Sequence, residues 1–187
     1  MADKHSGAQS GLTSKDKEYL LKLARATIRA RALGESLPEV TAENEILRRK
    51  SGAFVSLHRR GMLRGCIGYV EAVLPLANAV QEMALSAAFQ DPRFEKLSVD
   101  ELDDLDIEIS VLTPFEEIDD PELIDVGRHG LMIRKGSDSG LLLPQVPVQF
   151  GWDRLTFLSQ TCQKAGLEPD AWQDADAELF IFSADIF

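Results

Sequence analysis

Residues 63–68 read Leu63-Arg64-Gly65-Cys66-Ile67-Gly68, inside a run that alternates like a β-strand. Glycine weakens a strand, so a glycine here marks a place where another backbone or a ligand comes close. Side chains alternate along a strand, so Arg64, Cys66 and Gly68 share one face. Their spacing puts the Cα atoms of Arg64 and Cys66 about 7 Å apart, where a guanidinium favours a thiolate. This stretch therefore predicts a polar site around Cys66.

The flanking segments place this strand in an α+β arrangement. Residues 53–57 predict a partner strand, and the short loop between the two runs ends in Gly61, which indicates a β-hairpin. Residues 14–33 predict a helix before the hairpin, and a helix from Pro75 to about Phe89 follows it. Residues 105–113 alternate most clearly, with Asp106 and Glu108 on the polar face.

The last part of the chain predicts further hairpins and one helix. Strands are expected over residues 131–134 and 141–143, around a glycine-rich turn, and a single strand over residues 179–187. The helix between them begins after Asp153, ends at Gly166 and is expected to bury Leu155, Leu158, Cys162 and Ala165. Because hairpins outnumber βαβ units, we expect an α+β fold with a mainly antiparallel or mixed sheet flanked by helices.

Composition excludes several classes of protein. The formal net charge is −11, from 31 acidic and 20 basic residues among 187, which disfavours sequence-independent binding to nucleic acid and to anionic membrane surfaces. No apolar run is as long as a membrane span. Two distant cysteines form neither a disulfide framework nor a zinc site by themselves, so a cytoplasmic location is expected. Residues 1–12 are expected to be a disordered leader before one domain over residues 13–187.

Six separate strings carry a resemblance to a known family. They occur at residues 63–68, 90–94, 107–113, 127–131, 143–146 and 151–153. Together they resemble the AMMECR domain family, named after a human chromosomal region linked to Alport syndrome, midface hypoplasia and elliptocytosis. The resemblance covers the chain from about residue 19 to its end, and the six-residue cysteine motif is its most specific part.

The resemblance implies a two-part α+β fold, with a smaller second subdomain and the cysteine motif near a cleft between the parts. The biochemical activity of the family is not established, and the resemblance identifies no particular cofactor. Prokaryotic members are often encoded beside, or fused to, Memo-like proteins and radical S-adenosylmethionine enzymes. This chain is too short for such a fusion and lacks the cysteine triad of a radical enzyme, so such proteins are expected as separate partners.

Three residues are candidates for catalysis. Cys66 would be a nucleophile or redox group, with His129 as its general base and Glu108 as a second base or as the partner of an arginine. The alternatives are structural: a cysteine that fits a tight strand, a histidine that fixes a turn, and a solvated carboxylate. Neither the spacing of Asp106 and Glu108 nor any other pattern in the chain predicts a metal site.

Five further residues are candidates for binding a ligand. Arg64 would position an anion, Arg93 would clamp an anion or pair with Asp91, and Gln145 would present an amide in a cleft or satisfy backbone groups. Gly65 and Gly68 would let a ligand approach the strand. These residues predict a small-molecule site, belonging to a cysteine-dependent enzyme or to a component that handles its substrate. The alternative is a non-catalytic adaptor for a Memo-like or radical-enzyme partner.

Overall fold

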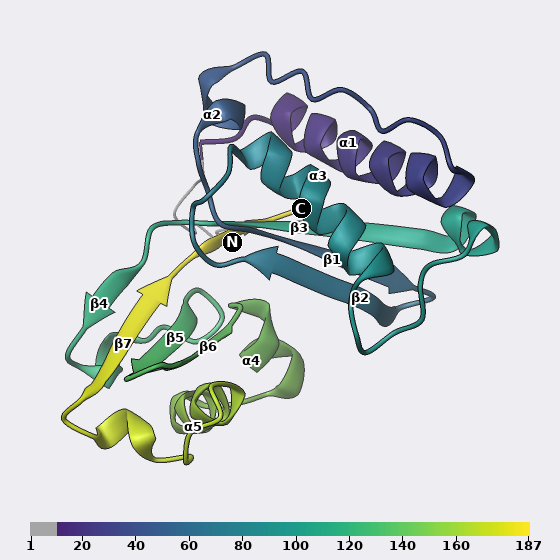
Figure 1. Cartoon of the computed structure of the whole chain (residues 1–187). Coiled ribbons are helices and arrows are strands. Elements are labelled where there is room, and N and C mark those ends of the chain that lie inside the picture. The colour runs from purple at the N-terminus through teal and green to yellow at the C-terminus, as the bar shows by residue number, and fades with distance from the viewer. Residues whose placement is uncertain (1–10) are drawn as a thin grey trace, which may run out of the picture. The chain divides into compact units, whose positions relative to one another are not determined.

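The chain divides into two compact units in the computed structural model, which describes residues 11–187 (Figure 1). The N-terminal unit comprises residues 11–112 together with residues 185–187. The inserted unit comprises residues 113–184. Both units combine helices with antiparallel strands, so the predicted α+β class is confirmed. The predicted cleft and the predicted smaller second subdomain stay predictions.

The N-terminal unit is built on a four-stranded sheet in the order β2-β1-β3-β8. The strands are β1 (Ala53–Arg59), β2 (Met62–Tyr69), β3 (Leu105–Leu112) and β8 (Ala184–Ile186). β1 pairs antiparallel with β2 and with β3, which confirms the predicted hairpin. The turn between β1 and β2 contains Arg60 and Gly61, both at positive φ, and such turns match the twist of a two-stranded ribbon.

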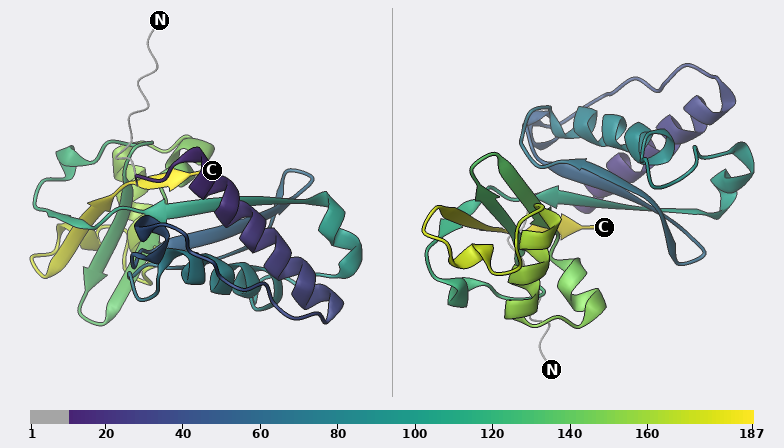
Figure 2. Two further views of the ribbon diagram at one scale, coloured as in Figure 1. Left: turned by 90° about the horizontal axis from the view of Figure 1, so that it is seen from above. Right: turned by 60° about the horizontal axis from the view of Figure 1, so that its bottom comes forward.

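Two long helices cover one face of this sheet (Figures 1 and 2). They are α1 (Ser14–Leu33) and α3 (Leu76–Phe89), with the short α2 (Glu45–Arg48) and the 3₁₀ helix η1 (Val99–Asp104) alongside. Thr13 and Asp16 form a capping box at the start of α1, and Gly34 ends that helix in the left-handed conformation. The core between helices and sheet is aliphatic and includes Leu20, Ile28, Val55, Leu57 and Val80, all with no exposed surface.

The inserted unit has a second four-stranded antiparallel sheet, in the order β4-β7-β5-β6. Its strands are β4 (Glu116–Ile118), β5 (Gly130–Lys135), β6 (Asp138–Leu142) and β7 (Ala177–Phe182). Its helices are η2 (Pro121–Leu123), α4 (Gln145–Phe150), α5 (Arg154–Lys164) and η3 (Ala171–Gln173). α5 packs on β5 and β6 and buries Phe157, Leu158 and Cys162 fully.

Two expectations were wrong in detail, and one helix was not expected. The C-terminal run is not one strand, because the chain leaves one sheet at Ser183 and enters the other, giving β7 and β8. Leu155 is 61% exposed. The buried face of α5 includes Phe157 and Thr161, and Leu155 lies outside this face. Residues 145–150 form a helix that the sequence did not indicate.

The expected leader lies outside the described residues, apart from Gly11 and Leu12. Within residues 11–187, no helix is long and apolar enough to cross a membrane.

Candidate functional site

Three polar side chains form a row across the sheet of the N-terminal unit. Ser56 of β1 lies opposite Cys66 of β2 on one side and opposite Glu108 of β3 on the other. Residues that are directly opposite in a sheet point to the same face. The core residues Val55 and Leu57 point to the helix-covered face, so the Cys66–Ser56–Glu108 row lies on the face away from α1 and α3.

The Cys66 thiol is partly buried and hydrogen-bonded. The Ser56 hydroxyl donates to Cys66 Sγ at 3.2 Å. Burial raises the pKa of the Cys66 thiol, while the Ser56 hydrogen bond and the nearby Arg93 charge act in the opposite direction and Asp91 and Glu108 add to the rise. Because burial outweighs the favourable contacts, Cys66 is a protonated thiol at neutral pH.

An ion pair takes the place of a neighbouring strand at the β2 edge. Asp91 Oδ2 accepts the Cys66 backbone N–H at 2.9 Å, and Arg93 Nη2 donates to the Cys66 carbonyl at 3.2 Å. Arg93 also donates to Asp91 from Nε at 2.9 Å and from Nη2 at 2.7 Å. The predicted pairing of Arg93 with Asp91 is therefore present, and it satisfies backbone groups that an edge strand leaves open.

Arg64 turns away from the thiol. The pairing of β1 with β2 shifts between Leu57 and His58, so that Arg64 is the extra residue of a β-bulge, and bulges redirect side chains. Arg64 donates to Glu101 from Nε at 2.8 Å and from Nη2 at 3.0 Å. This ion pair holds the pKa of Glu101 down to about 2. The cation whose field lowers the thiol pKa is Arg93, instead of the expected Arg64.

Both glycines of the cysteine motif are required by packing. A Cβ at Gly65 would lie 2.1 Å from the carbonyl oxygen of Ala87 in α3, so strand and helix backbones meet there. A Cβ at Gly68 would lie 2.2 Å from the ring of Phe54, its partner in β1. The close approach that the sequence predicts is thus made by protein atoms at both positions. Ligand contact at either glycine stays a prediction.

The remaining predicted residues lie in the inserted unit. His129 Nδ1 accepts the backbone N–H of Asp125 at 3.2 Å, and the backbone N–H of His129 donates to the Asp125 carbonyl at 2.8 Å, so this histidine fixes a turn. Burial, followed by the charge of Arg128, lowers the pKa of His129. Gln145 begins α4 and is half-buried. Their roles beside Cys66 stay predictions.

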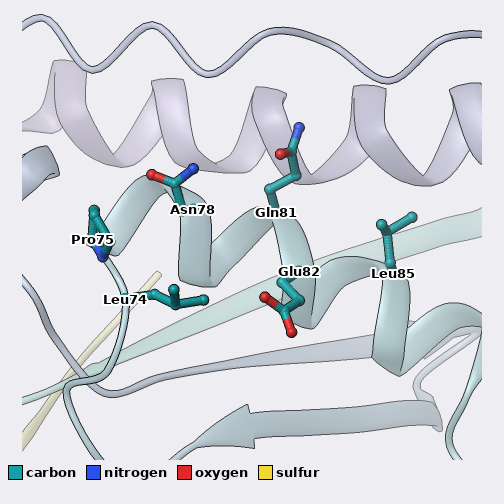
Figure 3. Close-up of a pocket in the computed structure, with 6 residues that line it drawn as sticks. All are labelled: Leu74, Pro75, Asn78, Gln81, Glu82 and Leu85. Carbon is teal, nitrogen blue, oxygen red and sulfur yellow. The ribbon is translucent and has the colours of Figure 1, made fainter.

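Two hollows of the N-terminal unit lie away from the Cys66 row. The larger, about 460 Å³, follows one side of α3 (Figure 3) and is lined by Leu74, Pro75, Asn78, Gln81, Glu82 and Leu85. Hydrogen bonds already engage two of its polar residues, since Glu82 accepts from Tyr69 at 2.6 Å and Gln81 donates to the Pro38 carbonyl at 2.8 Å. The smaller, about 180 Å³, lies between α1 and η1.

Three residues of the site were not among the sequence candidates. Ser56 could have been found from the register of the predicted hairpin, because it is the polar residue between buried Val55 and Leu57. The sequence indicates Asp91 only as a partner of Arg93, and it indicates Glu101 only as part of a predicted capping box, Ser98-Val99-Asp100-Glu101. No group of three or more His, Cys, Asp or Glu side chains in residues 11–187 is arranged to hold a metal ion.

Comparison with known proteins agrees with the sequence strings. The AMMECR1 family profile matches residues 21–187. A protein of Methanothermobacter thermautotrophicus is 44% identical over 185 residues, covering 94% of this chain and 95% of the relative. A protein of Methanopyrus kandleri is 45% identical over 186 residues, covering 94% and 89%.

A solved structure agrees in fold as well. The crystal structure of the uncharacterized protein PH0010 from Pyrococcus horikoshii is similar, with a TM-score of 0.84 and 43% sequence identity, covering 90% of this chain and 89% of that one. The similarity of sequence and the similarity of fold both extend over nearly the whole length. The chain therefore belongs to the AMMECR1 family.

Proposed function

We propose that the N-terminal unit binds a small polar molecule over Cys66, and that the protein acts as a cysteine-dependent enzyme or as a component that handles an enzyme's substrate. The observation that carries the proposal is the convergence of three segments on one thiol. Ser56 of β1 bonds its sulfur, Arg93 of the loop after α3 bonds its backbone, and Glu108 of β3 lies in the same row.

Each group of this site offers a different interaction to a ligand. The sulfur already accepts from Ser56, which leaves the weak S–H donor of Cys66 for a ligand acceptor. Among the described residues no hydrogen bond engages Arg93 Nη1, and the Arg93 side chain is 52% exposed. Arg93 is therefore suited to an anionic group, while Glu108 is suited to a donor or a cation.

Binding also changes what the thiol can do. Burial keeps Cys66 protonated in the free protein, so a covalent step requires the thiol proton to leave when a substrate is bound. Glu108 is the carboxylate of the row and is the proposed acceptor of that proton. His129 fixes a turn of the inserted unit and takes no part in this step.

Protection of Cys66 from a thiol reagent tests this proposal. Methyl methanethiosulfonate is small and neutral, and mass spectrometry separates its product at Cys66 from that at Cys162, which has no exposed surface. Rates are measured on the full chain with and without each member of a library of amino acids, carboxylic acids and amides. We expect at least one compound to slow the modification of Cys66 several-fold.

The matched variants decide whether protection comes from the row. Glu108→Gln should abolish protection, whereas Asp106→Asn, on the same strand and face but outside the row, should preserve it. The proposal fails if no compound slows the modification, or if Glu108→Gln and the unsubstituted chain are protected equally.

A further inference from the structure

The inserted unit exposes large apolar side chains at one corner. Val148 and Phe150 of α4, Leu155 of α5 and Leu123 of η2 are each more than half exposed, at 62%, 61%, 61% and 55%. They are all of the large apolar side chains exposed in the described inserted unit. We call this set the α4–α5 corner. Phe150 stacks on Trp152 with ring centroids 5.1 Å apart, so its position is fixed although it is exposed.

Contacts tie the three segments of the α4–α5 corner together. Arg154 of α5 donates to the Ile124 carbonyl at 3.1 Å and forms an ion pair with Glu122, which places η2 beside the start of α5. The space beside Gly127 is filled by Val148, whose Cγ2 would lie 3.1 Å from a Cβ there. A group of exposed apolar side chains on a fixed local frame is typical of a surface that binds another protein.

Charge selects the kind of partner. Residues 113–184 hold 13 acidic and 5 basic side chains, a formal charge of −8, so the inserted unit carries most of the negative charge of the chain. The run over residues 116–125 contains six acidic residues and no basic one, and it includes Leu123. Net negative charge on the unit that carries the apolar side chains attracts a basic partner and repels an acidic one.

We propose that the α4–α5 corner docks a protein segment that presents two or three apolar side chains flanked by lysine or arginine. A second copy of this chain is disfavoured as the occupant, because its inserted unit carries the same net negative charge. An anionic lipid surface is disfavoured for the same reason. The proposal concerns a surface of the inserted unit and is independent of ligand binding at Cys66.

Selection from a random peptide library tests the proposal without a known partner. The full chain is immobilised, a phage-displayed library of 16-residue peptides is selected on it, and peptides that also bind the Phe150→Ser/Leu155→Ser variant are removed. We expect the enriched peptides to carry a positive net charge and apolar residues at regular spacing. Synthetic copies should bind the unsubstituted chain at least tenfold more tightly than the double variant.

A control variant separates this corner from exposed apolar residues in general. Met62→Ser/Val99→Ser removes two exposed apolar side chains of the N-terminal unit, which are 71% and 51% exposed, and it should leave peptide affinity unchanged. Thermal unfolding of each variant checks that the fold is intact. If Phe150→Ser/Leu155→Ser unfolds, the single variant Val148→Ser is used in its place.

Four results would overturn the proposal. They are the absence of any enriched peptide, enrichment of acidic or uncharged peptides, equal affinity for the corner variant, and a concentration-dependent dimer that Phe150→Ser/Leu155→Ser abolishes in analytical ultracentrifugation. The last result would assign the corner to self-association.

Discussion

Asp91 Oδ2 accepts a hydrogen bond from the backbone N–H of Cys66 at 2.9 Å. The same carboxylate accepts from the backbone and side chain of Arg93, and the Asp91 side chain is 1% exposed. These bonds hold the pKa of Asp91 well below its usual range. One carboxylate thus links the loop after α3 to the strand that carries the thiol.

Replacing this carboxylate should destabilise the N-terminal unit. Asp91→Ala leaves the Cys66 N–H and the Arg93 guanidinium without their acceptor, and we expect a loss of about 2–4 kcal/mol in the free energy of unfolding. Urea titration followed by circular dichroism measures the loss. Asp103→Ala, at an exposed aspartate of the same unit, is the control and should change stability by less than about 0.5 kcal/mol. Equal stabilities of the two variants would contradict the role given to Asp91.

The Arg64–Glu101 pair should make the stability of the N-terminal unit sensitive to acid. The pKa of Glu101 falls from 4.5 to about 2 on folding. As the pH is lowered, the unfolded chain therefore binds this proton at a higher pH than the folded chain does. The stabilisation is therefore fully present above pH 4.5 and is lost as the pH falls toward 2. Glu101→Gln should flatten the dependence of unfolding free energy on pH over this window. An unchanged slope in the variant would show that other carboxylates cause the acid sensitivity.

Gly65 should not tolerate even one added methyl group. The Cβ of Gly65→Ala would meet the Ala87 carbonyl, a backbone atom of α3 that cannot move without shifting the helix. We expect a loss of about 1–3 kcal/mol or more in the free energy of unfolding. Gly61→Asn is the matched control, because Gly61 has φ +76° and nothing within 4 Å of its Cβ position, and asparagine accepts that conformation. Chemical denaturation of both variants makes the comparison.

Charged thiol reagents should report which ions lie beside Cys66. The thiolate attacks the sulfenyl sulfur of a methanethiosulfonate, forms a mixed disulfide and releases methanesulfinate. We expect Arg93→Gln to slow the anionic sulfonatoethyl reagent several-fold relative to the neutral methyl reagent, because Arg93 supplies the nearby positive charge.

The opposite substitution provides the check. Glu108→Gln should speed the anionic reagent relative to the neutral one, because it removes a negative charge that acts on the thiol. Since the pKa of Cys66 is raised, the rate with the neutral reagent should still be rising at pH 9. A plateau near pH 7 would mean that Cys66 is an activated thiolate.

His129 should make the inserted unit less stable in mild acid. Its Nδ1 accepts the Asp125 N–H, and protonation would replace that acceptor with a donor. Because folding lowers the pKa of His129 below 6.5, the stabilisation is present above pH 6.5 and is lost as the pH falls below it. The protection factor of the Asp125 amide, which is its intrinsic exchange rate divided by its measured rate, should fall over this range in the unsubstituted chain. His129→Gln should lack that pH step, and a persisting step would assign it to another group.

Local patterns in the sequence were sufficient for most of the fold. The helix over residues 14–33 was predicted with both of its ends, because Thr13 and Gly34 are local signals. The segment after Ser98 has the predicted capping box but forms a 3₁₀ helix. The division of the C-terminal run at Ser183 could not be predicted, because β7 and β8 are both apolar and differ only in the sheet that receives them.

The candidate site was predicted less completely. The alternation of residues 63–68 predicts only that Arg64 and Cys66 share a face, and it could not show the bulge that turns Arg64 toward Glu101. A bulge depends on the pairing of two strands and leaves no mark in either one alone. The row with Ser56 and Glu108 likewise depends on register across three strands.

β3 and the C-terminal segment formed by β8 and Phe187 exchange two backbone hydrogen bonds between Ile109 and Phe187, at 2.8 and 3.1 Å. They are therefore the two arms of a hairpin in which the whole of residues 113–184 replaces the turn. A gene that joins residue 112 to residue 185 through a short glycine linker would therefore encode the N-terminal unit, with Cys66, as an uninterrupted polypeptide. A stop codon at residue 183 would instead remove β8, the edge strand of that unit's sheet.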